Sequence, residues 1–550
     1  MRQLFDEINY FLRQKFFMLF LCITAIACYG FAITHVGIGV DDTMVDIYIQ
    51  DGLEVIMGRW TCFLVNKLFH FGEYMPFITE FAGMLLLMTA AVLYCVLFKR
   101  LAGDKITVTA YTAFACAFVS CPFIADVNVY YYHDGTDLGH ILCAIALLFF
   151  LEALNKKGRG SWMCRLWSMI FLWAAAGCYE SFVVTYIVGV VLILFFRGMF
   201  NAEKVTFKLL VKECFLCFGT VVGCIILRSL MCRILTVLFS IQQITSADAF
   251  RSVGSEFMKL LAEGEVMGQV NMLVKRYWLV YFVNALVYLP IRIYVLALLV
   301  FVAASLVCAV REKNIWYPVM IFGTVLAPWL ISLAEMGLPL YRSCQYMPLF
   351  TASALLVLYR PLAEKRLKKF GSAAFVVLSA ILVWNQSYEM NRSFYTDYKK
   401  YEHAREMLTD IAREITARYG TDATVVFTGS YDQPYELMKD YIVSYYSPEF
   451  NKIRSLSGLT GDPYLIEKYY TPYGYYFGGE AQYSVIDWGL WAFDKPGFEL
   501  ANFLQMHGYQ IYSTDDTEIL QMLQDYSGTM PEWPAEGSVT EMDGYVIVHL

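Results

Sequence analysis

Three aspartates lie close together in the polar stretch that follows the first apolar segment. Asp41 and Asp42 are adjacent, and Asp46 follows four residues later. A carboxylate at a membrane surface can take a proton from a hydroxyl group, because partial burial raises its pKa. Carboxylate oxygens are also the ligands that Mg²⁺ or Mn²⁺ takes. The pattern predicts Asp41 or Asp42 as a general base, without separating the two, and Asp42 with Asp46 as ligands of a divalent cation. The alternative is an ordinary solvated acidic loop.

Two arginines lie beside the ends of apolar segments. Arg59 stands between Gly58 and Trp60, and Arg342 precedes the segment that begins at residue 343. A guanidinium group donates two parallel hydrogen bonds to a phosphate and keeps its charge at any relevant pH. We therefore predict that Arg59 and Arg342 bind a phosphate group, the alternative being that they extend to lipid headgroups.

Further arginines lie within or beside apolar segments, at Arg228, Arg233 and Arg292. Charges in such positions are costly and often functional. The alternative is that the ends of the helices lie elsewhere.

Two other loops carry polar groups that could contact a substrate. The first holds His133, Asp134, Asp137 and His140, and the second is a tight turn with Tyr179 and Glu180. The first loop could also bind a metal, although adjacent His and Asp residues are poorly spaced for that. We predict that Asp46, His133, Asp134, Tyr179 and Glu180 contact the acceptor of the reaction or support the aspartates. Ordinary polar loops are the alternative.

The periodicity of residues 43–60 predicts a surface helix that would position the acids. On such a helix, Val45, Ile49, Leu53, Ile56 and Trp60 form one apolar stripe. Asp42, Asp46, Gln50 and Glu54 then face the other side. Like charges at this spacing repel, so a cation or a basic partner would favour the arrangement.

The composition is that of a membrane protein. Of the 550 residues, 58% are hydrophobic and only 17% are charged, against roughly 25% charged in soluble domains. The net charge of −7 says little about nucleic acid, but no basic cluster argues for it, so we expect no nucleic acid as a partner. Eleven apolar segments approach the length that a bilayer requires. They cover residues 16–36, 77–98, 106–122, 139–154, 166–179, 181–197, 214–240, 284–310, 315–334, 343–359 and 371–384.

The distribution of Lys and Arg predicts the orientation. With the N-terminus in the cytoplasm, the short loops on the inside carry most of the basic residues, as multi-pass membrane proteins generally show. Eleven spans then place the C-terminus outside, on the same side as Asp41 and Asp42. We therefore expect the polar chemistry at the outer face of the cytoplasmic membrane.

The composition changes after Trp384. Residues 385–550 resemble a soluble domain and contain no apolar run that could span a bilayer. Periodicity and turn residues predict helices at 398–419, 498–507 and 517–526, strands at 423–428 and 510–513, and a hairpin at 539–550. The predicted fold is thus a multi-span α-helical membrane domain at 1–384, followed by an extracytoplasmic α/β domain at 385–550.

Two short motifs carry a resemblance to a known family. The Asp41-Asp42 pair followed by Gly58-Arg59-Trp60, and the turn Cys178-Tyr179-Glu180-Ser181-Phe182, resemble segments of the bacterial membrane glucosyltransferases of the Gtr type II family. Glu180 stands where that family more usually has Gln. The resemblance implies a GT-C-like catalytic domain in the membrane.

The resemblance also implies an activity and its partners. Such enzymes move a sugar, here glucose, from a polyprenyl-phosphate donor to a cell-surface polysaccharide or glycopolymer, and they work with a flippase and a donor synthase. Two alternatives come from other classes of protein. One is a transporter or flippase of a lipid-linked glycan, and the other is a non-catalytic envelope protein that binds glycan.

Overall fold

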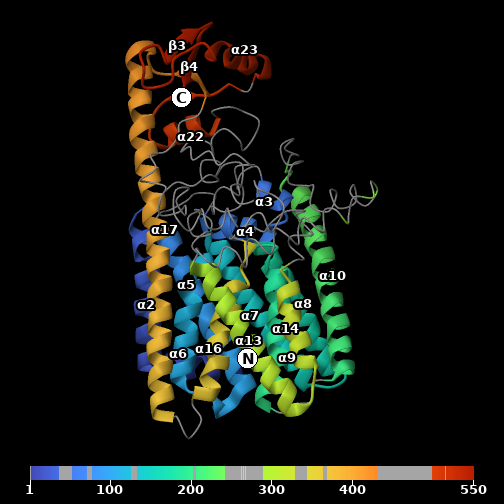
Figure 1. Ribbon diagram of the computed structural model, residues 1–550. Coiled ribbons are helices and arrows are strands. Elements are labelled where there is room, and N and C mark those ends of the chain that lie inside the picture. Colours follow the sequence, from blue (N-terminus) through green and yellow to red (C-terminus); the bar gives the residue numbers. More distant parts are fainter. Residues whose placement is uncertain are drawn as a thin grey trace.

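A bundle of long apolar helices forms the larger part of the molecule (Figure 1). The computed structural model describes residues 2–35, 52–70, 77–124, 133–201, 206–241, 262, 264, 267, 289–328, 343–362, 368–429, 498–514 and 516–550. After the short α1 (Arg2–Leu12), the bundle consists of α2 (Lys15–Thr34), α5 (Ile78–Ala102), α6 (Val108–Val119), α7 (His133–Asn155), α8 (Arg159–Cys178), α9 (Phe182–Asn201), α10 (Phe207–Leu238), α13 (Leu289–Glu312), α14 (Trp316–Leu326), α16 (Met347–Leu362) and the first part of α17 (Lys368–Tyr419).

Each apolar segment predicted from the sequence coincides with one of the helices from α2 to α17. Within the described residues, seven of these helices are long and apolar enough to cross a membrane: α2, α5, α7, α9, α10, α13 and α17. The helices α6, α14 and α16 are apolar but shorter. The class of helical membrane protein is therefore confirmed, whereas eleven spans remain a prediction.

The interior of the bundle is built from small and aromatic side chains. The central helix α5 packs against α6, α7 and α9, and its residues Ala90, Ala91, Tyr94 and Cys95 are fully buried. Small residues let helices approach closely. Close packing is important in a membrane because the hydrophobic effect does not drive helices together in lipid. All 15 cysteines are free thiols and twelve are buried, so they act as small packing residues in this interior.

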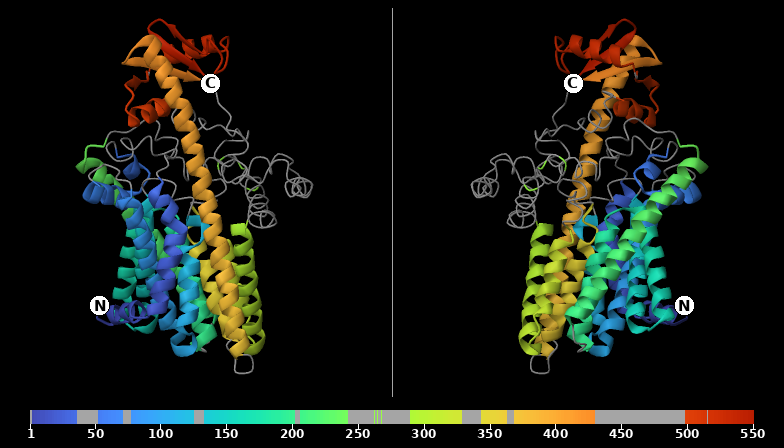
Figure 2. Two further views of the ribbon diagram at one scale, coloured as in Figure 1. Left: turned by 90° about the vertical axis from the view of Figure 1, so that its left-hand side faces the viewer. Right: turned by 90° about the vertical axis from the view of Figure 1, so that its right-hand side faces the viewer.

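The helix α17 leaves the bundle and continues into the C-terminal part of the chain (Figure 2). It has 52 residues, and at 1.5 Å per residue it is about 78 Å long. Hydropathy and periodicity predict its two ends as separate elements, at 371–384 and 398–419. The structure joins them because residues 372–419 contain no Gly or Pro to end the helix. The predicted domain boundary at residue 384 thus falls inside one helix.

A four-stranded sheet packs against the end of α17. It consists of β1 (Ala423–Thr428), β2 (Ile511–Tyr512), β3 (Val539–Met542) and β4 (Tyr545–His549) in the order β2-β1-β4-β3. Strand β1 pairs in parallel with β2 and β4, and β3 pairs antiparallel with β4. Helix α22 (Phe498–Met506) lies with α17 on one face of the sheet, and α23 (Thr517–Ser527) lies on the other.

Alternating side chains of β1 fill the cores on the two faces of the sheet. Phe427 is fully buried against Leu408 and Ile411 of α17. Val426 points to the opposite face and packs with Leu523 of α23. The predicted elements at 423–428, 498–507, 510–513, 517–526 and 539–550 coincide with the observed helices and strands.

The chain around residue 58 forms two short helices instead of one long one. Helix α3 (Leu53–Ile56) and helix α4 (Trp60–Val65) are separated by a turn at Gly58, whose φ is +88°. The prediction of a continuous helix to residue 60 is therefore wrong, since a left-handed residue ends a helix. Glu54, predicted on the polar face, is only 4% exposed, and its carboxylate accepts hydrogen bonds from Asn66 Nδ2 at 3.1 and 3.3 Å.

Candidate functional site

Two turns that are far apart in the sequence meet at the end of the bundle where α3 and α4 lie (Figure 1). Arg59 Nη2 lies 3.7 Å from Glu180 Oε1, and Arg59 Cζ lies 4.5 Å from the centre of the Tyr179 ring. Arg228 of α10 reaches the same carboxylate, with 3.5 Å between its Nη2 and Glu180 Oε2. We call these three charged residues the Arg59–Glu180–Arg228 cluster.

Arg228 holds the turn that precedes Arg59. Its Nε donates a hydrogen bond to the carbonyl oxygen of Gly58 at 2.9 Å, and its Nη2 donates to that of Met57 at 2.8 Å. A Cβ atom at Gly58 would lie 2.2 Å from Arg228 Nη2. Position 58 therefore requires glycine for two reasons. Its backbone is left-handed, and the guanidinium group of Arg228 approaches it too closely for a side chain.

Aromatic packing fixes α4 against α8. The rings of Trp60 and Trp173 stack with their centres 4.5 Å apart, and Thr61 Oγ1 donates a hydrogen bond to the Ala174 carbonyl at 2.8 Å. A Cβ at Gly177 would lie 2.3 Å from Trp60 Nε1, so glycine is needed for this approach. Because Trp60 follows Arg59 directly, the stacked pair also determines where the Arg59 side chain emerges.

The cluster is positively charged around one ionised carboxylate. Burial raises the pKa of the Glu180 carboxyl, but the guanidinium charges of Arg59 and Arg228 outweigh this effect and hold the pKa below its usual value. Two guanidinium groups and one carboxylate together carry a net charge of +1. Such an arrangement favours an anionic group, and Arg59, with 19% of its side chain exposed, is accessible to one.

A family model supplies the decisive comparison. The model described as Glucosyl transferase GtrII matches residues 30–359, which is more than half of the chain. The chain belongs to the GtrII glucosyl transferase family. The match begins near the end of α2, ends in α16 and includes the whole Arg59–Glu180–Arg228 cluster. Searches of curated proteins and of solved structures found no significant match.

The structure of this GtrII chain brings together some of the predicted site residues. Arg59, Tyr179 and Glu180 are in contact, and the Tyr179 hydroxyl lies 3.4 Å from Ser343 Oγ. Asp41, Asp42, Asp46 and Arg342 lie outside the described residues, as do the side chains of His133 and Asp134 at the start of α7. Their roles, and the cation expected at Asp42 and Asp46, remain predictions.

His140 lies among tightly packed side chains of the bundle. It is fully buried in α7, its Nε2 lies 2.8 Å from Gln345 Oε1, and its ring meets those of Phe118 and Phe182 edge-on. Among the described residues, no group of three or more His, Cys, Asp or Glu side chains could hold a metal ion. His140 thus contributes to the packing of the bundle. The metal site considered for this loop stays a prediction, because the side chains of His133 and Asp134 lie outside the described residues.

The sequence analysis did not assign Arg228, Gly58 or Trp173 to the site. For Arg228 a signal existed, because a charge within an apolar segment is often functional. Gly58 belongs to the Gly58-Arg59-Trp60 motif, but that motif does not show that Arg228 approaches it. For Trp173 the sequence holds no such signal, since its role arises only from its contact with Trp60 of α4.

We expect Gly58→Ala to displace Arg228 and to lower glucosyl transfer by about a hundredfold, since misplacing a site by about 1 Å can cost that much. Gly103→Ala is the matched control. Gly103 also has a positive φ, of +59°, but a Cβ there meets nothing within 4 Å. Transfer rates in membranes and thermal unfolding should be measured for both variants. Equal losses in both would contradict the role assigned to Gly58.

The lowered pKa of Glu180 gives a dependence of stability on pH. Its folded-state pKa lies below the ordinary value of 4.5, so the ionised group stabilises the fold above that pH, and this contribution is lost as the pH falls through the folded-state pKa. We expect the unfolding temperature of the wild type to exceed that of Glu180→Gln by a constant amount from about pH 8 to pH 5, and the difference to shrink below about pH 4.5. A difference that persists unchanged under acid would contradict the ion pairing.

Proposed function

We propose that this GtrII chain is a GT-C-type enzyme that moves glucose from a polyprenyl-phosphate carrier to a cell-surface polysaccharide or glycopolymer at the outer face of the cytoplasmic membrane. The Arg59–Glu180–Arg228 cluster is the observation that carries the proposal. It joins the Gly58-Arg59-Trp60 motif and the Cys178–Phe182 turn, which are separate in the sequence, through the ion pair between Arg59 and Glu180.

Arg59 binds the phosphate of the donor. During transfer, a bond forms between the acceptor oxygen and the anomeric carbon of glucose, and the bond from that carbon to the phosphate oxygen breaks. The phosphate leaves on the lipid with one more negative charge. A guanidinium group fixed by Tyr179 and Glu180 stabilises that developing charge without having to reorganise. Arg342 is proposed as a second phosphate ligand.

Asp41 or Asp42 takes the proton from the acceptor hydroxyl. Asp41 lies seven residues after the end of α2, and the pair precedes α3. The C-terminal end of α2 and the whole of α3 lie at the same end of the bundle as α4, which follows Arg59 (Figure 1). Asp46, His133 and Asp134 are proposed acceptor contacts, together with Tyr179 and Glu180. A divalent cation at Asp42 and Asp46 would help to bind the phosphate.

The orientation of the chain is part of the proposal. Most Lys and Arg residues of the short loops lie at the end of the bundle that is far from the Arg59–Glu180–Arg228 cluster. This distribution supports a cytoplasmic position for the end with the basic loops. The aspartates, Arg59 and the sheet at the end of α17 then lie outside, where the acceptor glycan is. Family membership favours transfer over a transporter or a non-catalytic glycan-binding protein.

We expect purified protein in lipid nanodiscs to release or transfer glucose from a short-chain polyprenyl-phosphate glucose. Asp41→Asn or Asp42→Asn should lower this turnover by about 10²- to 10⁴-fold, the range for loss of a general base. Asp104→Asn, an exposed acid at the other end of the bundle, is the matched control. Absence of turnover with every polyprenyl-phosphate sugar and glycan acceptor would contradict the proposal.

Arg59→Lys should reduce kcat/KM for the donor by about 10²-fold, because lysine replaces a fixed two-pronged donor with a flexible point charge. Arg311→Lys, at an exposed position near the end of α13, should leave kcat/KM unchanged. The measurement is initial transfer rate against donor concentration. A rate for Arg59→Lys close to that of the wild type would exclude Arg59 as the phosphate ligand.

A further inference from the structure

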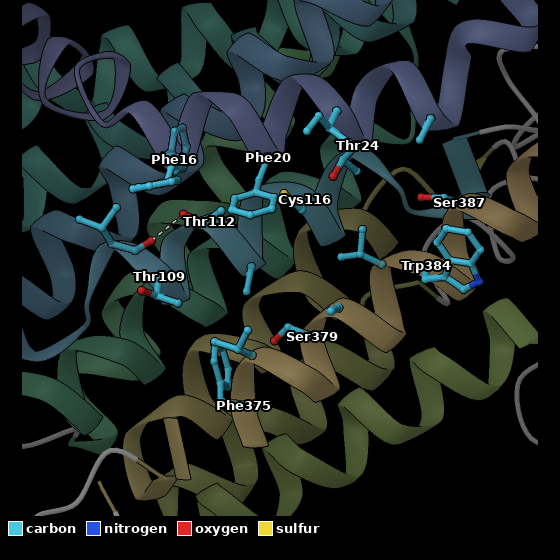
Figure 3. Close-up of a pocket in the computed structure, with 18 of the residues that line it drawn as sticks. Phe16, Phe20, Thr24, Thr109, Thr112, Cys116, Phe375, Ser379, Trp384 and Ser387 are labelled. Carbon is cyan, nitrogen blue, oxygen red and sulfur yellow. Dashed lines mark hydrogen bonds between the residues drawn. The ribbon is translucent and has the colours of Figure 1, made fainter. Parts of the chain in front are cut away.

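A long groove lies on the side of the bundle between α2, α6 and α17 (Figure 3). Its volume is about 770 Å³, within the range of roughly 300–1,000 Å³ that is typical of ligand pockets. Most of its wall is apolar, and the side chains of Phe16, Phe20, Phe375 and Trp384 line it along its length. Phe16 and Trp384 remain 75% and 74% exposed, so the groove opens towards the lipid.

The dimensions of the groove suit an acyl chain. Its lining runs from Lys15 to Ala27 on α2 and from Phe375 to Asn391 on α17. At 1.5 Å per residue, these stretches are about 18 and 24 Å long. The hydrocarbon core of a bilayer is roughly 30 Å thick, and each leaflet accounts for about half of that thickness. A lipid that enters at the Lys15 end could therefore lay one whole acyl chain in the groove.

The Lys15 end of the groove is built for an anion. Helix α2 begins at Lys15, and its N-cap residue, Gln14, has extended backbone and makes no side-chain cap hydrogen bond. The first amide groups of a helix have no acceptor within the helix and carry partial positive charge. Both Gln14 and Lys15 line the groove, so a positively charged residue and the start of a helix lie together at this end of it.

A buried hydroxyl group further inside points to the next part of such a ligand. Ser379 lines the groove and is only 5% exposed, and its Oγ has no hydrogen-bond partner within the described part of the chain. Serines in apolar helices usually donate to the carbonyl four residues earlier, as Thr112 does to Val108 in the same groove. Ser379 is thus able to donate to an acceptor in the groove, such as an ester carbonyl.

The groove is separate from the proposed donor site. Lys15 lies at the opposite end of α2 from Thr34, about 29 Å away along the helix, whereas Arg59 lies at the end of the bundle near α3 and α4 (Figure 1). The cluster of Arg59 and Arg228 also involves α8, α9 and α10, none of which lines the groove. A donor phosphate at Arg59 therefore cannot account for an anion site at Lys15.

We propose that the groove binds one anionic glycerophospholipid. The lipid phosphate lies at Lys15 and the start of α2, an ester carbonyl accepts a hydrogen bond from Ser379, and one acyl chain fills the space between α2, α6 and α17. The bound lipid completes the packing of α17, the helix that carries the C-terminal sheet.

The first test is native mass spectrometry of the full chain exchanged into phosphatidylglycerol, phosphatidylcholine or polyprenyl phosphate, without any sugar donor. We expect one molecule of phosphatidylglycerol to be retained, with a preference of about fivefold over phosphatidylcholine, which is the effect of one lysine near an anionic headgroup. The variant Lys15→Gln should lose this preference. Arg311→Gln, at the same end of the bundle, should keep the preference. Equal retention of both phospholipids, or preferred retention of polyprenyl phosphate, would overturn the proposal.

Three further variants, one of them a control, test the position of the lipid. Ala380→Trp places a large ring in the groove and should abolish retention, whereas Val377→Trp, exposed on α17 away from the groove, should not. Ser379→Ala should weaken retention about two- to tenfold, the range for one hydrogen bond, and an ether-linked phosphatidylglycerol should not respond to it. Retention unaffected by Ala380→Trp, or an equal response of ester and ether lipids, would overturn the assignment. These measurements do not depend on glucosyl transfer, so the two proposals can fail separately.

Discussion

A guanidinium group within an apolar helix must be paired, because an uncompensated charge among apolar helices is costly. Arg228 of α10 is paired with two backbone carbonyls, at Met57 and Gly58, and with the Glu180 carboxylate. These contacts link α10 to the turn before α4 and to the turn between α8 and α9. The position of Arg59 follows from them, because it is the next residue after the turn that Arg228 holds. The electrostatic requirement of one partly buried arginine thus organises the site.

Glu180 has a double role in this arrangement. Its carboxylate neutralises part of the charge of two arginines, which allows both guanidinium groups to lie close together. A neutral glutamine at this position would leave both positive charges without a partner carboxylate. The Glu180 carboxylate holds Arg59 more firmly in place, and it also weakens the net positive field that attracts an anionic donor. The charge of residue 180 therefore sets the balance between the order of Arg59 and the attraction for an anion.

Within the described residues, the helix α17 runs without a break from the bundle to the sheet. Its first part lines the groove beside α2 and α6, and its last part supplies Leu408, Ile411 and Ile415 to the core of the sheet. No change of backbone conformation separates the two parts. The packing of α17 against the bundle, which a lipid in the groove would complete, consequently determines where the sheet is held.

Hydropathy, periodicity and turn residues are local properties, and they suffice to predict the helices of the bundle, the strand at 423–428 and the two motifs of the site. Three features emerge only from the folded chain: Arg59 meets Glu180, Arg228 approaches Gly58, and the helix expected to reach residue 60 is interrupted at Gly58. These contacts join residues more than a hundred positions apart, and no local pattern specifies them. The continuity of α17 was also missed, since the loss of hydropathy after Trp384 marks the end of an apolar surface and not the end of a helix.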